Sequence, residues 1–197
     1  MKEFENVNLV NQPLIQNKLT HLRSKKTESR DFRLTLEELT TLMVYEITRD
    51  YPLKEVNIET PLEESTGKIL DTKIALVPIL RAGVGMLEGV LNLIPSAKVG
   101  HIGLYRDEES LEPVEYYSKL PQPLNEFKII VVDPMLATGG TATAGVELVK
   151  EKGGEDVKFL CLVAAPEGID KFNRTHPEVP IYTAAIDREL DKDAYIR

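Results

Sequence analysis

The sequence lacks the features that mark secreted and membrane-spanning proteins. It contains one cysteine, Cys161, which lies within an apolar run. A lone buried thiol argues against a disulfide framework and fits a reducing compartment. The N-terminus, Met-Lys-Glu-Phe-Glu, has no apolar signal core, and no apolar run approaches the length of a membrane span. These absences predict a cytoplasmic protein with no membrane partner.

Basic residues are in the minority, which disfavours a further class of protein. The formal net charge is −8, from 24 Lys and Arg against 32 Asp and Glu. This balance disfavours nonspecific binding to nucleic acid. It does not exclude an anionic substrate, because the Debye length at cellular salt is about 8 Å and remote surface acids are screened. A site for such a substrate needs cations of its own.

The elements that the sequence does contain predict one α/β domain over residues 1–197. Apolar residues make up 42% of the chain and charged residues 28%, as is ordinary for a globular protein. Strand and helix candidates alternate, which predicts a mostly parallel sheet flanked by helices with right-handed crossovers. The predicted strands are 73–80, 99–105, 129–132, 157–165 and 181–185, and the predicted helices include 84–94, 141–152 and 169–174.

Two further segments carry local signals. The stretch Thr35-Leu-Glu-Glu38 has the pattern of a capping box and predicts a helix that begins there. Its apolar residues recur at three- and four-residue spacings, so one stripe of the helix should face the core. Residues 51–72 predict a short edge strand and a loop, because prolines and a glycine interrupt the alternation of Val56 and Ile58.

The most informative stretch is 129–141, Ile-Ile-Val-Val-Asp-Pro-Met-Leu-Ala-Thr-Gly-Gly-Thr. Four β-branched residues predict a buried parallel strand that ends at Asp133. The glycines of the following loop can adopt φ > 0 and bring bare backbone close to a ligand. The loop N–H groups, with the hydroxyls of Thr138 and Thr141, can donate to a phosphate at the start of a helix. Asp133 can accept from a sugar hydroxyl beside it.

An ordinary strand-to-helix turn is the alternative interpretation of this stretch. Asp133 would then be a polar stop, and the glycines would serve only to form the turn. A P-loop is not indicated, because no Gly-Lys-Ser/Thr follows.

Arg81 follows the predicted strand 73–80 and precedes a predicted helix. In open parallel sheets, ligands bind at the carboxyl ends of the strands. A guanidinium binds phosphate oxygens bidentately, which suits this position; the alternative is a surface arginine paired with a nearby acid. The glycines at 83, 85 and 89 only superficially resemble a dinucleotide fingerprint, because the third comes one residue late.

Residues 106–123 are long, polar and aromatic for a crossover connection. They predict a hairpin or flap beside the site, and a lid of this kind excludes water from the reaction. Within this region, the pair Tyr116-Tyr117 is predicted to make a packing or dimer contact. His101, in the preceding strand, is predicted to be a core or interface residue rather than a base.

Several of these motifs together resemble a known family. The stretch 131–141 resembles the phosphoribosyl-pyrophosphate (PRPP) motif of the type I phosphoribosyltransferases. Most members carry two adjacent acids where this chain has Asp133-Pro134, and this departure is similar to the uracil phosphoribosyltransferases. The resemblance runs from about Asn11 to the last residue. It continues through Val77-Pro-Ile-Leu-Arg81-Ala-Gly83, Tyr105-Arg-Asp-Glu-Glu109, Leu111-Glu-Pro113 and Ala164-Ala-Pro-Glu-Gly168.

The resemblance implies a reaction and a site. It implies transfer of the 5-phosphoribosyl group from PRPP to uracil, giving UMP and pyrophosphate in pyrimidine salvage, without a covalent intermediate. Asp133 and Arg106 are implied as catalytic residues, the latter on a mobile hood. Magnesium is expected to arrive with PRPP rather than on direct protein ligands. The implied PRPP site comprises Arg81, Ala82, Gly83, Arg106, Asp133, Pro134, Met135, Leu136, Ala137, Thr138, Gly139, Gly140 and Thr141.

The same resemblance carries expectations about assembly and about the C-terminus. A homodimer or larger homo-oligomer is expected, with an effector such as GTP. The family continues after Arg197 with a glycine-rich segment whose backbone reads the uracil edge, and Ile196 is the one position of that region present here. We therefore expect the uracil-binding segment to be cut off after Arg197. If the protein ends there, the alternative function is a nucleotide- or PRPP-binding regulator without catalysis.

Overall fold

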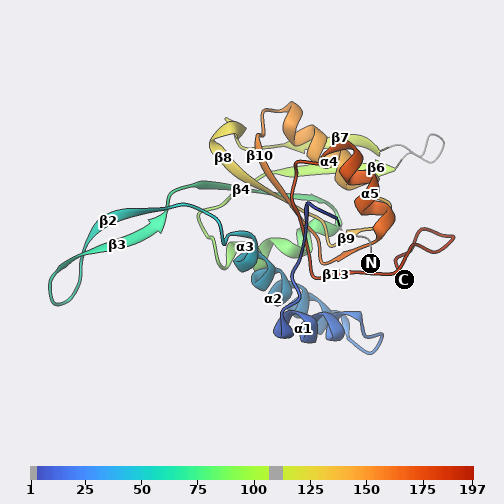
Figure 1. The fold of residues 1–197 in the computed structure, drawn as a ribbon, viewed down its shortest axis with the longest axis horizontal. Helices are drawn as coiled ribbons and strands as arrows, with labels where there is room; N and C mark the ends of the chain where they lie inside the picture. The colour runs from blue at the N-terminus through green and yellow to red at the C-terminus, as the bar shows by residue number, and fades with distance from the viewer. Residues whose placement is uncertain (1–3, 107–112) are drawn as a thin grey trace.

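The computed structural model describes residues 4–106 and 113–197, with Arg106 described in its backbone alone (Figure 1). Its centre is an eight-stranded sheet in the order β1-β12-β10-β8-β4-β6-β7, with β5 paired to β4. All described pairs in this sheet are parallel except β6 with β7. The predicted mostly parallel α/β fold is thereby confirmed. The strands are β1 Val7–Leu9, β4 Lys73–Leu80, β5 Lys98–Val99, β6 His101–Arg106, β7 Pro113–Lys119, β8 Phe127–Val132, β10 Asp156–Leu160 and β12 Ile181–Thr183.

Helices cover both faces of this sheet (Figure 1). One face carries α4 Gly140–Glu151 and α5 Pro166–Thr175, and the other carries α1 Pro13–Arg23, α2 Ser29–Ile47 and α3 Leu87–Leu91. Each side has its own apolar core. None of the helices within the described ranges has both the length and the apolar character to cross a membrane.

Strand β8 is apolar at successive positions because both of its faces are buried. Ile129 and Val131 point into the core under α4 and α5, whereas Ile130 and Val132 point into the core over α1, α2 and α3. All four side chains are fully buried. Burying a side chain of this kind contributes about 1.5–3 kcal/mol, so a polar residue at either register would destabilise one of the two cores. The predicted buried strand is confirmed.

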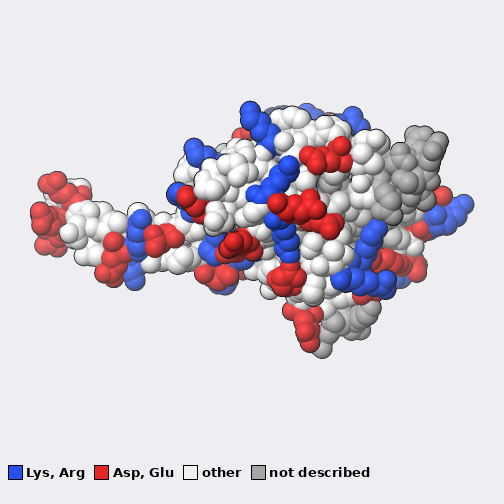
Figure 2. All heavy atoms as spheres, turned by 90° about the horizontal axis from the view of Figure 1, so that it is seen from above, with Lys and Arg blue, Asp and Glu red and all other residues white. Residues whose placement is uncertain are grey.

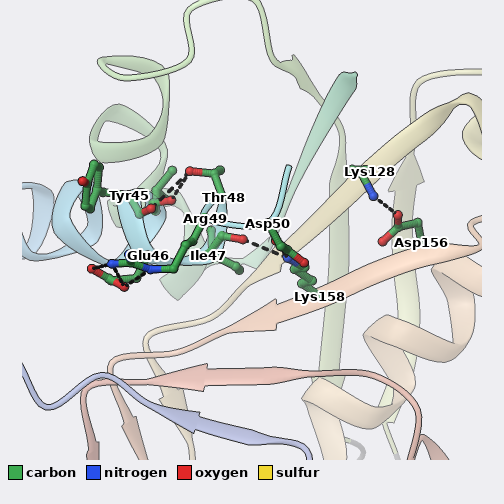
Figure 3. A network of polar contacts seen from close by, with 10 residues as sticks. Tyr45, Glu46, Ile47, Thr48, Arg49, Asp50, Lys128, Asp156 and Lys158 are labelled. Atoms are coloured by element: carbon green, nitrogen blue, oxygen red, sulfur yellow. Dashed lines mark hydrogen bonds and ion pairs between the residues drawn. The ribbon is translucent and has the colours of Figure 1, made fainter. Parts of the chain in front are cut away.

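A buried lysine ties the end of α2 to the sheet (Figure 3). Lys158 on β10 is 6% exposed. Its Nζ donates to the carbonyl of Ile47 at 2.9 Å and to the carboxylate of Asp50 at 2.5 Å. It also lies 4.7 Å from the centroid of the Tyr51 ring. These partners compensate for the loss of water around the ammonium group, and the Lys158 hydrogen bond lowers the pKa of Asp50.

The prediction of a short edge strand and a loop over residues 51–72 is wrong. Two antiparallel strands, β2 Leu53–Glu59 and β3 Glu64–Leu70, form an arm that projects from the body (Figure 1). Figure 2 shows acidic side chains gathered at the tip of this arm. Gly67 suggested a loop, but it is a strand residue: a Cβ there would lie 3.2 Å from Cδ1 of Ile58. The missing side chain makes room for the isoleucine across the pair.

Two predicted helix boundaries also need correction. Helix α2 begins at Ser29, so Thr35 lies inside the helix and caps nothing. Residues 29–34 contain no glycine or proline that would stop a helix, so the helix extends through them despite the capping pattern at Thr35. The predicted helix 84–94 is instead a 3-10 turn at Ala82–Met86 followed by the short α3. Its several glycines lower the helix propensity of this segment.

Candidate functional site

The segments that follow β4, β8 and β10 meet at the carboxyl edge of the sheet. A small parallel sheet extends this edge, formed by β9 Met135–Leu136, β11 Val163–Ala164 and β13 Ala185–Ile186. The N–H of Leu162 donates to the carbonyl of Pro134 at 2.9 Å, and the N–H of Ala165 donates to the carbonyl of Leu136 at 2.9 Å. The structure therefore joins the motif that contains Asp133 to the motif that begins at Ala164.

Two glycines allow the loop before α4 to lie directly on the first turn of α5. Gly139 has φ of +79°, the left-handed conformation that favours glycine. A Cβ on Gly139 would lie 2.6 Å from the carbonyl oxygen of Gly168, and a Cβ on Gly168 would lie 2.3 Å from that of Ala137. Neither position has room for a side chain. The loop is thus held by backbone contact with a helix from a separate motif.

This loop encloses a small pocket of about 80 Å³, at the N-terminus of α4. The N–H of Thr143 makes an intrahelical hydrogen bond to the carbonyl of Gly139 at 2.9 Å. The N–H groups before it are the free donors of a helix N-terminus and favour an anion. The residues that line the pocket are Asp133, Met135, Leu136, Ala137, Thr138, Gly139, Thr141 and Ala142.

Asp133 places an unusual carboxyl group in this pocket. Burial raises its pKa to about 7, and a hydrogen bond from the N–H of Met135 partly offsets the rise. In the unliganded protein, the buried carboxyl therefore favours folding in its protonated form, and this contribution is lost as the pH rises through about 7. The neighbouring Cys161 is fully buried, which raises the pKa of its thiol to about 12. That thiol stays protonated and is not an activated nucleophile.

Arg81 and the two residues after it approach the same strand ends. A Cβ on Gly83 would lie 2.5 Å from the carbonyl oxygen of Val132, so this loop packs directly against the end of β8. Arg81 and Ala82 are exposed. Among the residues that the structure describes, no acid pairs with Arg81, so the alternative of a paired surface arginine does not hold there.

A hairpin is present in the predicted region, as the antiparallel pair β6 and β7, which forms one edge of the eight-stranded sheet. Arg106 is the last residue of β6 and pairs with Pro113, while the predictions that concern 107–112 lie outside the described residues. Tyr116 packs over Gly103, and its ring centroid lies 6.3 Å from that of Tyr105. This contact agrees with the packing alternative for the tyrosine pair. Its neighbour Tyr117 is 44% exposed.

Ile196 belongs to the C-terminal segment, outside the lining of this pocket. It forms an antiparallel bridge with Leu190 and is not among the residues that line the pocket. Conversely, the sequence-based site omits Gly168 and Lys171, both of which approach the loop from α5. Gly168 ends the motif Ala164-Ala-Pro-Glu-Gly168, and Lys171 follows it by nearly one helical turn. Helical spacing places Lys171 on the same face of α5 as Gly168, but only the contact of that face with the loop identifies the lysine.

The acids of the pocket bear on how it could hold a metal ion. Asp133 is its single acidic lining residue. Within the ranges 4–106 and 113–197, no group of three or more His, Cys, Asp or Glu side chains could form a metal cage. Magnesium commonly binds through one or two carboxylates together with substrate phosphates and water. This donor set fits an ion that is carried by a phosphorylated substrate.

Comparison with known proteins gives consistent matches over nearly the whole chain. A family model described as uracil phosphoribosyltransferase matches residues 9–197. A uracil phosphoribosyltransferase of Acidovorax ebreus is 56% identical over 194 residues, covering 98% of this chain and 93% of the relative. The corresponding protein of Dictyoglomus thermophilum is 55% identical, covering 95% of this chain and 91% of the relative.

Solved structures agree with these matches. A protein structure from Aquifex aeolicus superimposes with a TM-score of 0.91 at 37% identity, covering 96% of this chain and 91% of that one. The structure of an APRTase from Giardia lamblia has a TM-score of 0.54 at 16% identity, covering 79% of this chain and 81% of that one. At that identity the second likeness shows a shared fold alone.

The contact between Gly139 and Gly168 can be tested with a matched pair of substitutions. Gly139→Ala and Gly153→Ala both place a Cβ at positive φ, but nothing lies within 4 Å of the Cβ position at Gly153. Gly153→Ala should lower the free energy of unfolding by about 1–2 kcal/mol, the cost of the left-handed conformation. Gly139→Ala should cost a further ~1–3 kcal/mol from overpacking, measured by urea unfolding. Equal losses would contradict the close approach.

Proposed function

The chain belongs to the uracil phosphoribosyltransferase family, and we propose that the pocket between β8 and α4 holds the 5-phosphate of PRPP. The enzyme transfers the 5-phosphoribosyl group from PRPP to uracil, giving UMP and pyrophosphate. The observation that carries the assignment of the site is one pocket that joins the Asp133 carboxyl to the N-terminus of α4. A phosphorylated sugar needs both features, one for its phosphate and one for its hydroxyl groups.

The phosphate contacts have the strength that anchoring requires. A hydrogen bond to a charged group contributes roughly 1.5–3 kcal/mol, so four donors from the loop N–H groups, Thr138 and Thr141 would contribute about 6–12 kcal/mol before ordering losses. A micromolar affinity corresponds to about 8 kcal/mol. The loop at 137–141 is therefore sufficient as the main anchor of PRPP.

Asp133 is proposed to act on the ribose. As a carboxylate it accepts from the ribose hydroxyls and stabilises the positive charge that develops on the anomeric carbon. N1 of uracil forms a bond to that carbon while the bond to pyrophosphate breaks, and the N1 proton is released to water. Positioning and electrostatics account for this reaction, and no covalent enzyme intermediate is needed. Ile196 is proposed to begin the segment that contacts uracil.

Cations are proposed to neutralise the leaving pyrophosphate. Arg81 and its neighbours Ala82 and Gly83 would bind it on one side, and Arg106 would meet it from the β6–β7 hairpin. An arginine fork matches the geometry of phosphate oxygens. Magnesium is proposed to arrive with PRPP, where it would offset the negative charge of the pyrophosphate. The remaining residues of the loop, Pro134 to Leu136, would shape the ribose side of the site.

A base panel tests the reaction. Purified protein with PRPP and magnesium should release pyrophosphate and form the nucleotide with uracil, and far less with cytosine or hypoxanthine. The readout is nucleotide product separated by chromatography. Formation of a purine nucleotide in preference to UMP would refute the assignment of uracil. Tight binding of UMP without any turnover would favour a regulator.

The role of Asp133 predicts a specific pH profile. Because the carboxylate is the reactive form and its pKa in the free protein is about 7, kcat/KM for PRPP should fall as the pH drops through about 7. Asp133→Asn should lower kcat by about two orders of magnitude, well beyond any change in KM, and should abolish this limb of the profile. An unchanged kcat would remove Asp133 from the chemistry.

The β2–β3 arm supports the proposal of a homodimer or larger assembly. An isolated two-stranded hairpin is marginally stable in water, yet this arm projects from the body (Figure 1). Several of its apolar side chains are exposed, and Leu62 at the turn is 96% exposed. A second copy of the chain that packs on the arm would bury these side chains. The other exposed members are Leu53, Ile58, Ile69 and Leu70.

Sedimentation velocity tests the role of the arm. The double change Leu62→Asp and Ile69→Asp should shift the protein from dimer to monomer, because charge in an apolar interface is costly. Leu34→Asp, at another exposed leucine on α2, should leave the assembly intact. A dimer that survives the double change would exclude the arm as the interface.

Two further properties are proposed on narrower grounds. The sequence resemblance supports an effector such as GTP, and initial rates measured with and without GTP test this regulation. The unpaired, buried thiol of Cys161 fits a reducing compartment and supports a cytoplasmic location. Fractionation of the native cell tests the location.

A further inference from the structure

The side chain of Lys171 runs from α5 across the loop that precedes α4. Its Cβ lies 3.2 Å from the position that a Cβ would take on Gly139, and its Nζ lies 3.4 Å from the corresponding position on Gly140. The hydroxyl oxygen of Thr138 lies 3.9 Å from that same position on Gly140. The ammonium group and the hydroxyl therefore both lie within 4 Å of one point at the N-terminus of α4.

The ammonium group is not engaged elsewhere. Helical spacing would pair Lys171 with Glu167, four residues earlier. Glu167 instead accepts a hydrogen bond from the N–H of Leu190 at 3.2 Å. Across the described part of the chain, Lys171 forms neither a hydrogen bond nor an ion pair. Its stem lies against backbone at Gly139, and its exposed ammonium group remains available to a ligand.

The residues that line the pocket beside it include no positively charged side chain. Its one charged lining residue is Asp133, which is negative when ionised. A phosphate dianion that enters the pocket therefore faces the neutral donors of the loop and a carboxyl group, but no cation of the lining. Lys171 lies beside Gly139 at the edge of this pocket, and its ammonium group carries the positive charge that the lining lacks. Lysine serves as a point charge for phosphate and does not require the fixed geometry of an arginine fork.

We propose that Lys171 binds the 5′-phosphate of PRPP and of UMP, together with the loop and Thr138. This inference rests on the proposed function of the pocket. The residue contacts the phosphate and not the reacting carbon, so it contributes to affinity and leaves the chemical step alone. Because Lys171 is exposed, its contribution is sensitive to salt.

The experiment compares UMP with uridine as inhibitors of the forward reaction, because the two ligands differ by the 5′-phosphate alone. Lys171→Met keeps the apolar stem and removes the charge. It should weaken inhibition by UMP about three- to tenfold at low salt, with inhibition by uridine unchanged. The KM for PRPP should rise by a similar factor while kcat and the KM for uracil hold. High salt should shrink the difference.

Two further variants complete the test. Lys152→Met removes an exposed lysine at the far end of α4 and should leave both inhibitors unaffected. Lys171→Arg should retain most of the affinity for UMP, because it keeps the charge. A Lys171→Met enzyme with the wild-type ratio of UMP to uridine inhibition would overturn the inference, as would a Lys171→Arg enzyme that loses as much as Lys171→Met.

The proposed function fails in a distinguishable way. If it is wrong, the wild-type protein forms no UMP from PRPP and uracil, and it binds UMP no better than uridine in a direct titration. If only the inference about Lys171 is wrong, the wild-type protein turns over and distinguishes the two ligands, and the methionine variant does so equally well.

Discussion

Backbone contact between the loop before α4 and the first turn of α5 is the constraint on which the site depends. Gly139 and Gly168 lie so close that neither tolerates a Cβ. Gly139 is left-handed at this contact, and α4 begins directly after it beside the pocket. The contact also brings α5, and with it Lys171, beside the loop at 137–141. The loop depends on this contact, because a Cβ on either glycine would push the two segments apart.

The sheet provides a rigid support for that contact. Strand β8 buries alternate residues in two separate cores, so its end is fixed from both faces. Asp133 follows directly, and its N–H donates to the carbonyl of Leu160 at 3.1 Å. The carboxyl is therefore held in a buried position, and burial is what raises its pKa to about 7. A titratable group whose pKa is shifted by burial to near 7 is typical of functional sites.

Local charge reconciles an acidic protein with an anionic substrate. The chain carries a formal charge of −8, yet its ion pairs at the surface leave particular cations free. Lys158 is buried and bonded to Asp50 and Ile47 (Figure 3), and it also contacts the Tyr51 ring, so it stabilises the fold. Arg81 and Lys171 are exposed near the strand ends without acidic partners among the described residues. Position, more than the total charge, decides which cations can meet a phosphate.

The sequence by itself determined the fold class, the buried strands 73–80 and 129–132, and the glycine-containing loop that leads from Asp133 into a helix, because these follow from local periodicity and from a contiguous motif. It misjudged the arm at Leu53–Leu70 and the start of α2, where pairing partners and neighbouring residues outweigh local signals. Only the tertiary structure decided that Gly139 rests on Gly168, that burial raises the pKa of Asp133, and that Lys171 reaches the loop. Each of these depends on the distance between segments far apart in the chain, which no local pattern encodes.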